Sequence, residues 1–197
     1  MTDFFFATPW PGVIAWSALY ISDYALTLKC ARLYRSGVAD KLVFEGSYEL
    51  NPIFQEDIDS LRAFSPNFLW WLALTVGAVF LFWWAGSQSG PEVYSILLGT
   101  MILLELAVHV RHVHNWFLFH EILAGAGVRG RIEYTRPLIL RLSSFDLYVF
   151  SGFFGLLFAI TLHWFFLGGA LGCLAAGNQD RHLARKQAGA PKATQDA

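Results

Sequence analysis

Apolar residues gather in four long stretches of this chain, separated by short polar connections. The stretches run approximately over residues 13–34, 67–86, 93–117 and 146–176. A helix needs roughly 20 apolar residues to cross about 30 Å of hydrocarbon, and each stretch meets that length. The pattern therefore predicts four membrane-spanning helices.

A shorter pattern follows the first apolar stretch. Asn51 and Pro52 form a typical helix start, with Asn as the N-cap and Pro at the first helical position. Phe54, Ile58 and Leu61 then recur at helical spacing, with acidic residues between them. This arrangement predicts a short amphipathic helix that lies along the membrane interface.

Composition agrees with a membrane protein and defines its organisation. Of the 197 residues, 55% are hydrophobic and only 15% are charged, and the mean hydropathy is +0.44. The short connections leave no room for a separate soluble domain. We expect an all-α integral membrane helical bundle, with one transmembrane domain over residues 1–176 and a polar, disordered tail over residues 177–197.

Basic residues indicate how the helices are oriented. Cytoplasmic loops are enriched in Lys and Arg, which here gather around the first and third connections. Four spans with those loops in the cytoplasm place both termini outside, whereas the basic tail favours the cytoplasm. A re-entrant piece over residues 114–128, or a hairpin within the last apolar stretch, would remove this conflict. The basic residues are Lys29, Arg32, Arg35, Lys41 and Arg62; Arg111, Arg129, Arg131, Arg136 and Arg141; and Arg181, Arg185, Lys186 and Lys192 in the tail.

Charge and cysteine content exclude several classes of protein. The net charge is -1 and no basic stripe carries interleaved aromatic residues, so nucleic acid is not an expected partner. Cys30 and Cys173 are too few and too scattered for a disulfide framework or a CxxC zinc motif. The expected surroundings are the lipid bilayer, with a lipid or another membrane protein as a further partner.

Ionisable residues interrupt the first and third apolar stretches. Glu105, His109 and His112 are spaced i, i+4 and i+7, so they share one helix face. Asp23 lies near the middle of the first stretch, with Thr27 one turn later. Each such group costs roughly 2–4 kcal/mol at membrane depth, which marks it as a candidate functional residue. Hydropathy and loop charge place both faces in the cytoplasmic half, where they can form one site.

Two residues of the first connection stand at the expected entrance of this site. Capping alone accounts for Asn51, which otherwise joins Thr27 as a candidate substrate-binding residue. Glu49 precedes the cap, and its side chain is either solvated or directed back into the mouth of the bundle. In the second case it is a candidate catalytic base, as Asp23 is deeper in the site.

The residue types favour metal chemistry. Two imidazoles with carboxylates suit one divalent metal, zinc first, leaving a position for water whose pKa the metal lowers. The ligands would be Glu105, His109, His112 and Asp23. We therefore expect a metal-dependent membrane hydrolase acting on a lipid, lipid-linked or peptide substrate.

Other uses of the same polar faces stay open. The groups could form a hydrogen-bond network between helices, a proton relay or small transporter, or a contact within a larger membrane complex. Six histidines are too few for the several histidine boxes of membrane desaturases. His163 is expected near the opposite membrane surface from His109, which argues against bis-histidine haem.

The third connection carries Arg131 and Arg136. Arg offers paired donors to phosphate, so these side chains are candidates for binding a substrate headgroup. The alternative is that they only supply the positive charge that sets topology.

Two resemblances can be stated from these motifs. The run SDYALTLKCARLY followed by YELNP resembles a group of small, uncharacterised prokaryotic multipass membrane proteins, in which Asp and Thr on the first helix precede an ExNP element. This resemblance implies a bacterial inner-membrane protein and supplies no activity. The pairing of Asp with His on membrane helices is similar to the zinc-dependent ceramidase and adiponectin-receptor superfamily, but helix number and His spacing differ, so no ligands are transferred.

Overall fold

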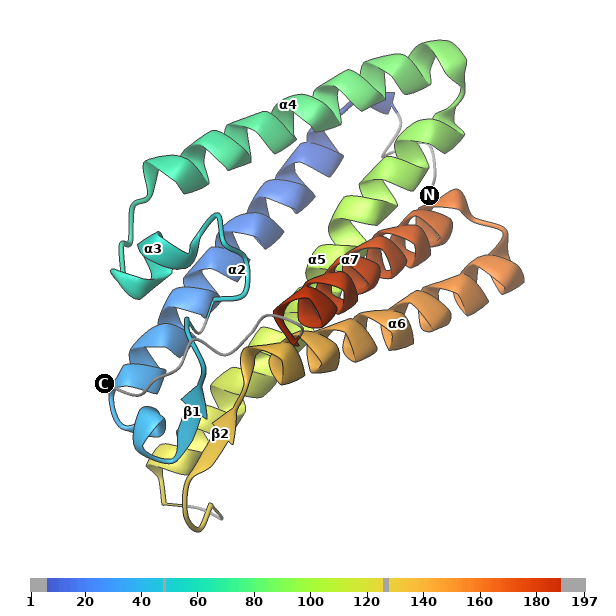
Figure 1. Ribbon diagram of the computed structural model, residues 1–197. Coiled ribbons are helices and arrows are strands. Elements are labelled where there is room, and N and C mark those ends of the chain that lie inside the picture. Colours follow the sequence, from blue (N-terminus) through green and yellow to red (C-terminus); the bar gives the residue numbers. More distant parts are fainter. Residues whose placement is uncertain (1–6, 48, 126–127, 189–197) are drawn as a thin grey trace.

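The computed structural model is mostly helical and describes residues 7–47, 49–125 and 128–188. Within these ranges the long helices are α2 (Trp10–Arg35), α4 (Pro66–Ser89), α5 (Pro91–Leu123), α6 (Arg136–Thr161) and α7 (Trp164–Ala188) (Figure 1). Shorter elements are a 3-10 turn (Val38–Asp40), α3 (Gln55–Asp59), β1 (Leu42–Phe44) and β2 (Ile132–Tyr134). The predicted all-α class is confirmed, apart from the two short strands.

Three helices, α4, α5 and α6, are long and apolar enough to cross a membrane. Large apolar side chains on them point outward: Trp70 on α4, and Phe145 and Ile160 on α6, are 64–71% exposed. Outward-facing side chains of this kind need lipid rather than water around them. The chain is therefore a multipass membrane protein.

The last apolar stretch forms two helices instead of one. Leu162 ends α6 in the left-handed conformation (φ 52°), and α7 begins at Trp164. The single span predicted over residues 146–176 is not observed. The structure has the hairpin that the sequence analysis gave as the alternative. The turn contains neither Gly nor Pro, so no breaker residue marked it in the sequence. Helix α7 also continues through residues 177–188, where a disordered tail was expected; residues 189–197 lie outside the described part.

Glycines allow α5 and α7 to pack with their backbones in contact. A Cβ atom on Gly99 would overlap the carbonyl oxygen of Phe165, and one on Gly168 would overlap that of Ile96. The Thr100 hydroxyl donates a hydrogen bond to the Gly168 carbonyl at 2.9 Å. Small residues and such interhelical hydrogen bonds drive helix association in membranes, where burial of apolar surface contributes little.

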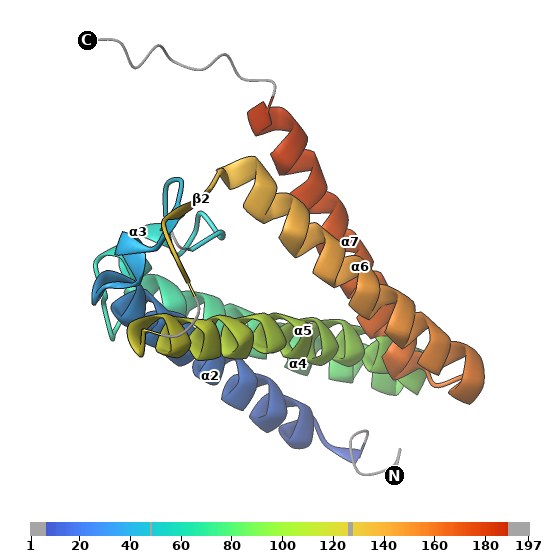
Figure 2. The same cartoon turned by 90° about the horizontal axis from the view of Figure 1, so that it is seen from below.

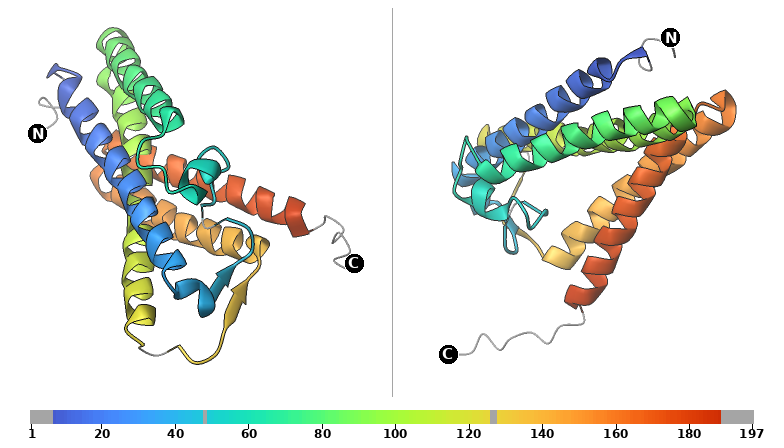
Figure 3. Two further views of the ribbon diagram at one scale, coloured as in Figure 1. Left: turned by 90° about the vertical axis from the view of Figure 1, so that its left-hand side faces the viewer. Right: turned by 90° about the horizontal axis from the view of Figure 1, so that it is seen from above.

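The helices form two arms that meet at one end. Figure 2 shows α6 and α7 as one arm, which meets α5 near the α6–α7 turn and diverges toward the end that carries β1, β2 and α3; α2 and α4 pack against α5 in the other arm. The right-hand view of Figure 3 shows the same V shape. At the open end, parallel pairing of β1 with β2 (Leu42 with Ile132, Phe44 with Tyr134) connects the arms. Three-residue strands are too short to produce a recognisable alternation, so the sequence did not predict them.

The connection between α2 and α4 differs from its prediction. Asn51 does not cap α3: its Oδ1 accepts a hydrogen bond from the Ile53 N–H at 3.1 Å, which forms a turn, and Phe54 occupies the N-cap position. Helix α3 is only five residues long, and Ile58 on it is fully buried against α2 and α4. The amphipathic spacing therefore anchors this connection to the bundle instead of forming a longer helix at the interface.

The contact between α5 and α7 gives a matched test of the fold. Gly168→Ala should lower the free energy of unfolding by about 1–3 kcal/mol, because the new methyl group meets backbone atoms that cannot rotate away. Gly155→Ala on α6 is the control, because nothing lies within 4 Å of its Cβ position. Thermal unfolding in detergent measures both. Equal midpoints for the two variants would contradict the close approach of α5 and α7.

Candidate functional site

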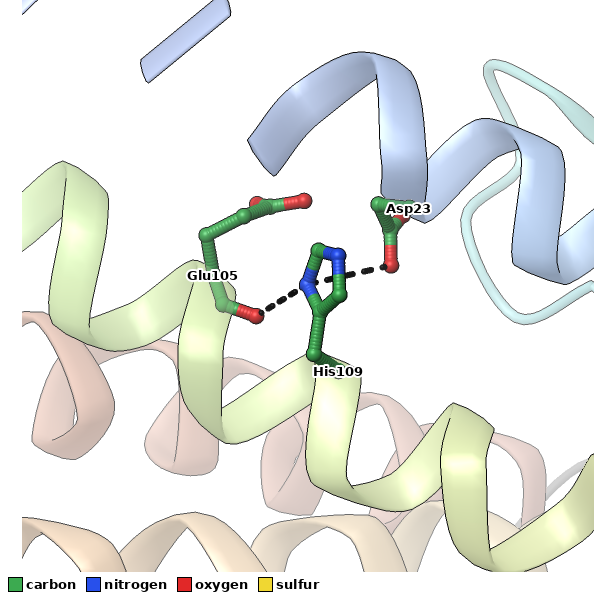
Figure 4. Close-up of side chains that lie close together, drawn as sticks. All are labelled: Asp23, Glu105 and His109. Carbon is green, nitrogen blue, oxygen red and sulfur yellow. Dashed lines mark hydrogen bonds and ion pairs between the residues drawn. The ribbon is translucent and has the colours of Figure 1, made fainter. Parts of the chain in front are cut away.

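Helices α2 and α5 bring three of the predicted residues together. Asp23 on α2 faces Glu105 and His109 on α5, and one ligand atom from each lies within 4.8 Å of the others (Figure 4). The His109 Nδ1 atom is 3.9 Å from Asp23 Oδ1. The i, i+4 spacing on α5 therefore produces the shared face that the sequence predicts, and Asp23 on α2 lies opposite it.

His112 continues the same face. Its Nε2 atom lies 3.3 Å from Asp23 Oδ1 and 3.3 Å from the Thr27 hydroxyl. Nitrogen and oxygen ligands at about 2.0–2.2 Å from a tetrahedral zinc lie roughly 3.3–3.6 Å apart. The Asp23–His112 separation already has that value, whereas the Asp23–His109 separation of 3.9 Å is wider, and His112 is not part of the group whose ligand atoms all lie within 4.8 Å of one another.

Ser22 forms a hydrogen bond with the ring of His109, and the sequence pattern did not predict this residue as part of the site. His109 Nε2 lies 2.7 Å from the Ser22 hydroxyl, which is also 2.9 Å from the Leu19 carbonyl. When Nε2 carries the proton, it donates to Ser22, Ser22 donates to Leu19, and Nδ1 keeps a lone pair for a cation. The other tautomer donates from Nδ1 to the Glu105 carbonyl, 2.9 Å away. Ser22 lies off the stripe formed by Asp23 and Thr27, so spacing gave no signal for it.

Three buried polar atoms of this cluster have no hydrogen-bond partner within the described residues. They are Asp23 Oδ1, Glu105 Oε1 and His112 Nδ1. Asp23 Oδ1 has the contact to His112 Nε2 at 3.3 Å, which is an ion pair only when that imidazole is protonated. Buried carboxylate oxygens without a donor are strongly disfavoured, and native proteins contain few. A cation bound between Asp23 and Glu105 would satisfy both oxygens.

A cavity of about 390 Å³ gives access to the cluster. Its walls come from α2, α5 and both helices of the α6–α7 hairpin, and the connection over residues 49–54 closes one side. Asp23, Thr27, Glu105 and His112 line it, as does Asn51. A second cavity of about 350 Å³ shares part of its wall with the first, namely Glu49, Leu50, Arg111, His112 and Ser143.

Glu49 is directed into the bundle, which was one of its two expected positions. It lines both cavities, and its Oε1 atom accepts a hydrogen bond from the Asn51 N–H at 2.7 Å. Burial raises the pKa of Glu49 above its ordinary value of 4.5, although the Asn51 N–H and the charge of Arg111 act in the opposite direction. Its proton is therefore exchanged closer to neutral pH than that of a solvated glutamate.

Arg111 also lines both cavities, although the sequence showed it only as loop charge. Its Nη1 donates a hydrogen bond to the Ser143 hydroxyl on α6, and Ser143 donates to Asp180 Oδ2 on α7 at 2.6 Å. Ser143 lies near the start of α6, whereas Asp180 reaches this position because the last apolar stretch folds back as a hairpin. A single straight span would not have placed Asp180 there.

The predicted headgroup arginines lie elsewhere. Arg131 is exposed and pairs with Glu133 at 2.9 Å. Arg136 supports the connection that carries Glu49: its backbone N–H donates to Glu45 Oε2 at 2.9 Å, and its side chain reaches the Leu50 carbonyl at 3.4 Å. Neither arginine lines the cavity.

Comparison of the chain with family models, with curated proteins and with solved structures gives no match. The functional argument therefore depends on the geometry of these residues.

Proposed function

We propose that this membrane protein binds one divalent metal, with zinc as the best fit, and uses it to hydrolyse a lipid, lipid-linked or peptide substrate. The observation that carries the proposal is the meeting of Asp23, Glu105 and His109, with His112 beside Asp23. Asp23, Glu105 and His112 line a cavity. Mixed imidazole and carboxylate ligands around a position open to a cavity are typical of catalytic rather than structural zinc sites.

Each residue has a distinct role in this proposal. Asp23, Glu105, His109 and His112 would supply four ligands and a water the fifth, as in the expanded five-coordinate shell of catalytic zinc. Ser22, when it accepts from His109 Nε2, would leave Nδ1 of that ring free for the metal. A metal in this position would lower the pKa of a bound water toward neutrality. Glu49 accepts the proton of the attacking water and passes it to the leaving group. Thr27 and Asn51 lie on the cavity wall beside the substrate.

The orientation proposed for the protein follows from the hairpin. Folding back at Leu162 returns the end of α7 to the side that carries β1 and β2. The basic residues of the first and third connections and of α7 then share one side, which the positive-inside rule assigns to the cytoplasm. This arrangement of α2, α4, α5, α6 and α7 removes the conflict that four spans create. The resemblance of the first 55 residues supports a bacterial inner membrane.

A non-enzymatic role is the second candidate. Two adjoining cavities share a wall that contains Glu49, Arg111 and His112, and titratable side chains between aqueous spaces are suited to moving protons or ions. Proton flux in liposomes that depends on Glu49, without a bound metal, would favour this candidate over the hydrolase.

Metal analysis tests the proposed site directly. Purified protein should contain about one zinc, iron or manganese per chain, and His109→Ala/His112→Ala should lose it because two ligands are removed. The matched control is His114→Ala/His120→Ala, which removes two exposed imidazoles of the same helix. Absence of metal from the folded wild type after resupply would overturn the hydrolase proposal.

The role of Glu49 is tested by the pH profile of hydrolysis. A general base works only when ionised, so activity should fall as pH drops through the raised pKa of Glu49. Glu49→Gln should retain the metal, lose this acid limb and hydrolyse about 10²–10⁴-fold more slowly. The measurement uses a panel of phospholipid, lipid-phosphate and peptide substrates, with Glu121→Gln as the exposed control. An unchanged rate in metal-loaded Glu49→Gln would contradict this role.

A further inference from the structure

Arg111 is the one Lys or Arg among the described residues that line the larger cavity. Within the described ranges its guanidinium forms no direct ion pair; it donates to the Ser143 hydroxyl, which donates in turn to Asp180. Burying an arginine in an apolar bundle costs free energy, and such residues usually line an ion or substrate pathway or bind a ligand. The hydroxyl fixes one edge of the guanidinium and leaves other N–H groups available to an anion.

The acidic side chains around Arg111 oppose the binding of an anion unless a cation offsets their charge. Four carboxylates line the same cavity: Asp23, Glu49, Glu105 and Asp180. A metal ion held by Asp23 and Glu105 would offset two of them, and this inference rests on the proposed function in that respect. Arg111 directly precedes His112 on α5, and both side chains line the cavity together with Asp23 and Glu105. An anion in this cavity could therefore lie between the metal and the guanidinium. Phosphate oxygens suit such a position because they accept paired donors from arginine and also bind divalent metals.

The remaining walls indicate the rest of the ligand. The cavity is lined by Tyr20 and Tyr24 of α2 and Phe68 of α4, and also by Leu104 of α5 and Leu147 of α6. A volume of about 390 Å³ is at the small end of ligand sites, so it holds a headgroup and the first part of a chain. The two arms diverge around this space, and their outer faces carry exposed apolar side chains that lipid must cover. An amphiphile fits this environment, because its polar headgroup suits the cavity and its apolar chain suits the aromatic and leucine side chains.

We propose that the cavity binds a phosphate-bearing lipid, with its phosphate on Arg111 beside the metal cluster and its chain against the aromatic and leucine wall. Ser143 and Asp180 are positioning residues that orient the guanidinium. The substrate class of the proposed hydrolase is then a phospholipid or lipid phosphate rather than a peptide.

Binding of matched lipids to the full-length protein tests this proposal. Native mass spectrometry of the metal-loaded protein would compare phosphatidic acid with diacylglycerol of the same chains, and inorganic phosphate would be added as a competitor. Wild type should prefer phosphatidic acid. Arg111→Gln should bind it roughly tenfold or more weakly, because a charge-assisted pair is lost, while diacylglycerol binding and metal content stay unchanged. Arg141→Gln, an exposed arginine on α6, is the control.

Further variants and outcomes distinguish a failure of the lipid-phosphate site from a failure of the metal-dependent hydrolase. Ser143→Ala should weaken phosphatidic acid binding less than Arg111→Gln does, and Arg111→Lys should restore part of it. Metal-loaded wild type without preference for phosphatidic acid would overturn the lipid-phosphate site and leave the metal site standing. An Arg111-dependent preference in protein that binds no metal would support the lipid-phosphate site and overturn the hydrolase. Competition by inorganic phosphate at the same concentration as phosphatidic acid would overturn the lipid assignment.

Discussion

The cost of placing ionisable side chains inside an apolar bundle is the constraint on which this structure depends. Asp23 and Glu105 each keep a buried carboxylate oxygen without a hydrogen bond in the described part of the chain, and the one on Asp23 lies 3.3 Å from His112 Nε2. Neither α2 nor α5 needs these groups in order to form or to pack, because leucine or alanine would serve both purposes at lower cost. Their persistence, facing each other across two helices and beside two imidazoles, is the strongest reason to assign the cluster a ligand.

The arrangement of the helices leaves a cavity beside this cluster, through which a ligand can reach it. Backbone contact through Gly99 and Gly168 joins the two arms near the α6–α7 turn, and the arms diverge from there. The cavity lies between them, and at the open end β1 pairs with β2 while Arg111 bonds to Ser143 across the gap. The arms are therefore held together by glycine-mediated packing near the α6–α7 turn and by hydrogen bonds at the open end. Apolar packing along their whole length would leave no cavity between them.

Local periodicity made part of this account predictable. The i, i+4, i+7 spacing placed Glu105, His109 and His112 on one face, and a count of helical depth placed Asp23 opposite them. Features that depend on tertiary contacts were not accessible in the same way. The turn at Leu162 carries no breaker residue, and Asp180 lies near Arg111 only because of that turn. The role of Ser22 depends on its contact with the His109 ring, which spacing along one helix does not show. Asn51 had the right residue type for a cap, but its side chain stabilises a turn before α3.

X-ray absorption spectroscopy at the metal edge of purified, metal-loaded protein tests the central claim most directly. The account predicts a first shell of nitrogen and oxygen at about 2.0–2.2 Å, with the outer-shell scattering of two imidazoles and no sulfur. Replacement of His112 by Ala should remove one imidazole from that spectrum. A shell dominated by sulfur at about 2.3 Å, or one without imidazole scattering, would contradict a site built from Asp23, Glu105, His109 and His112.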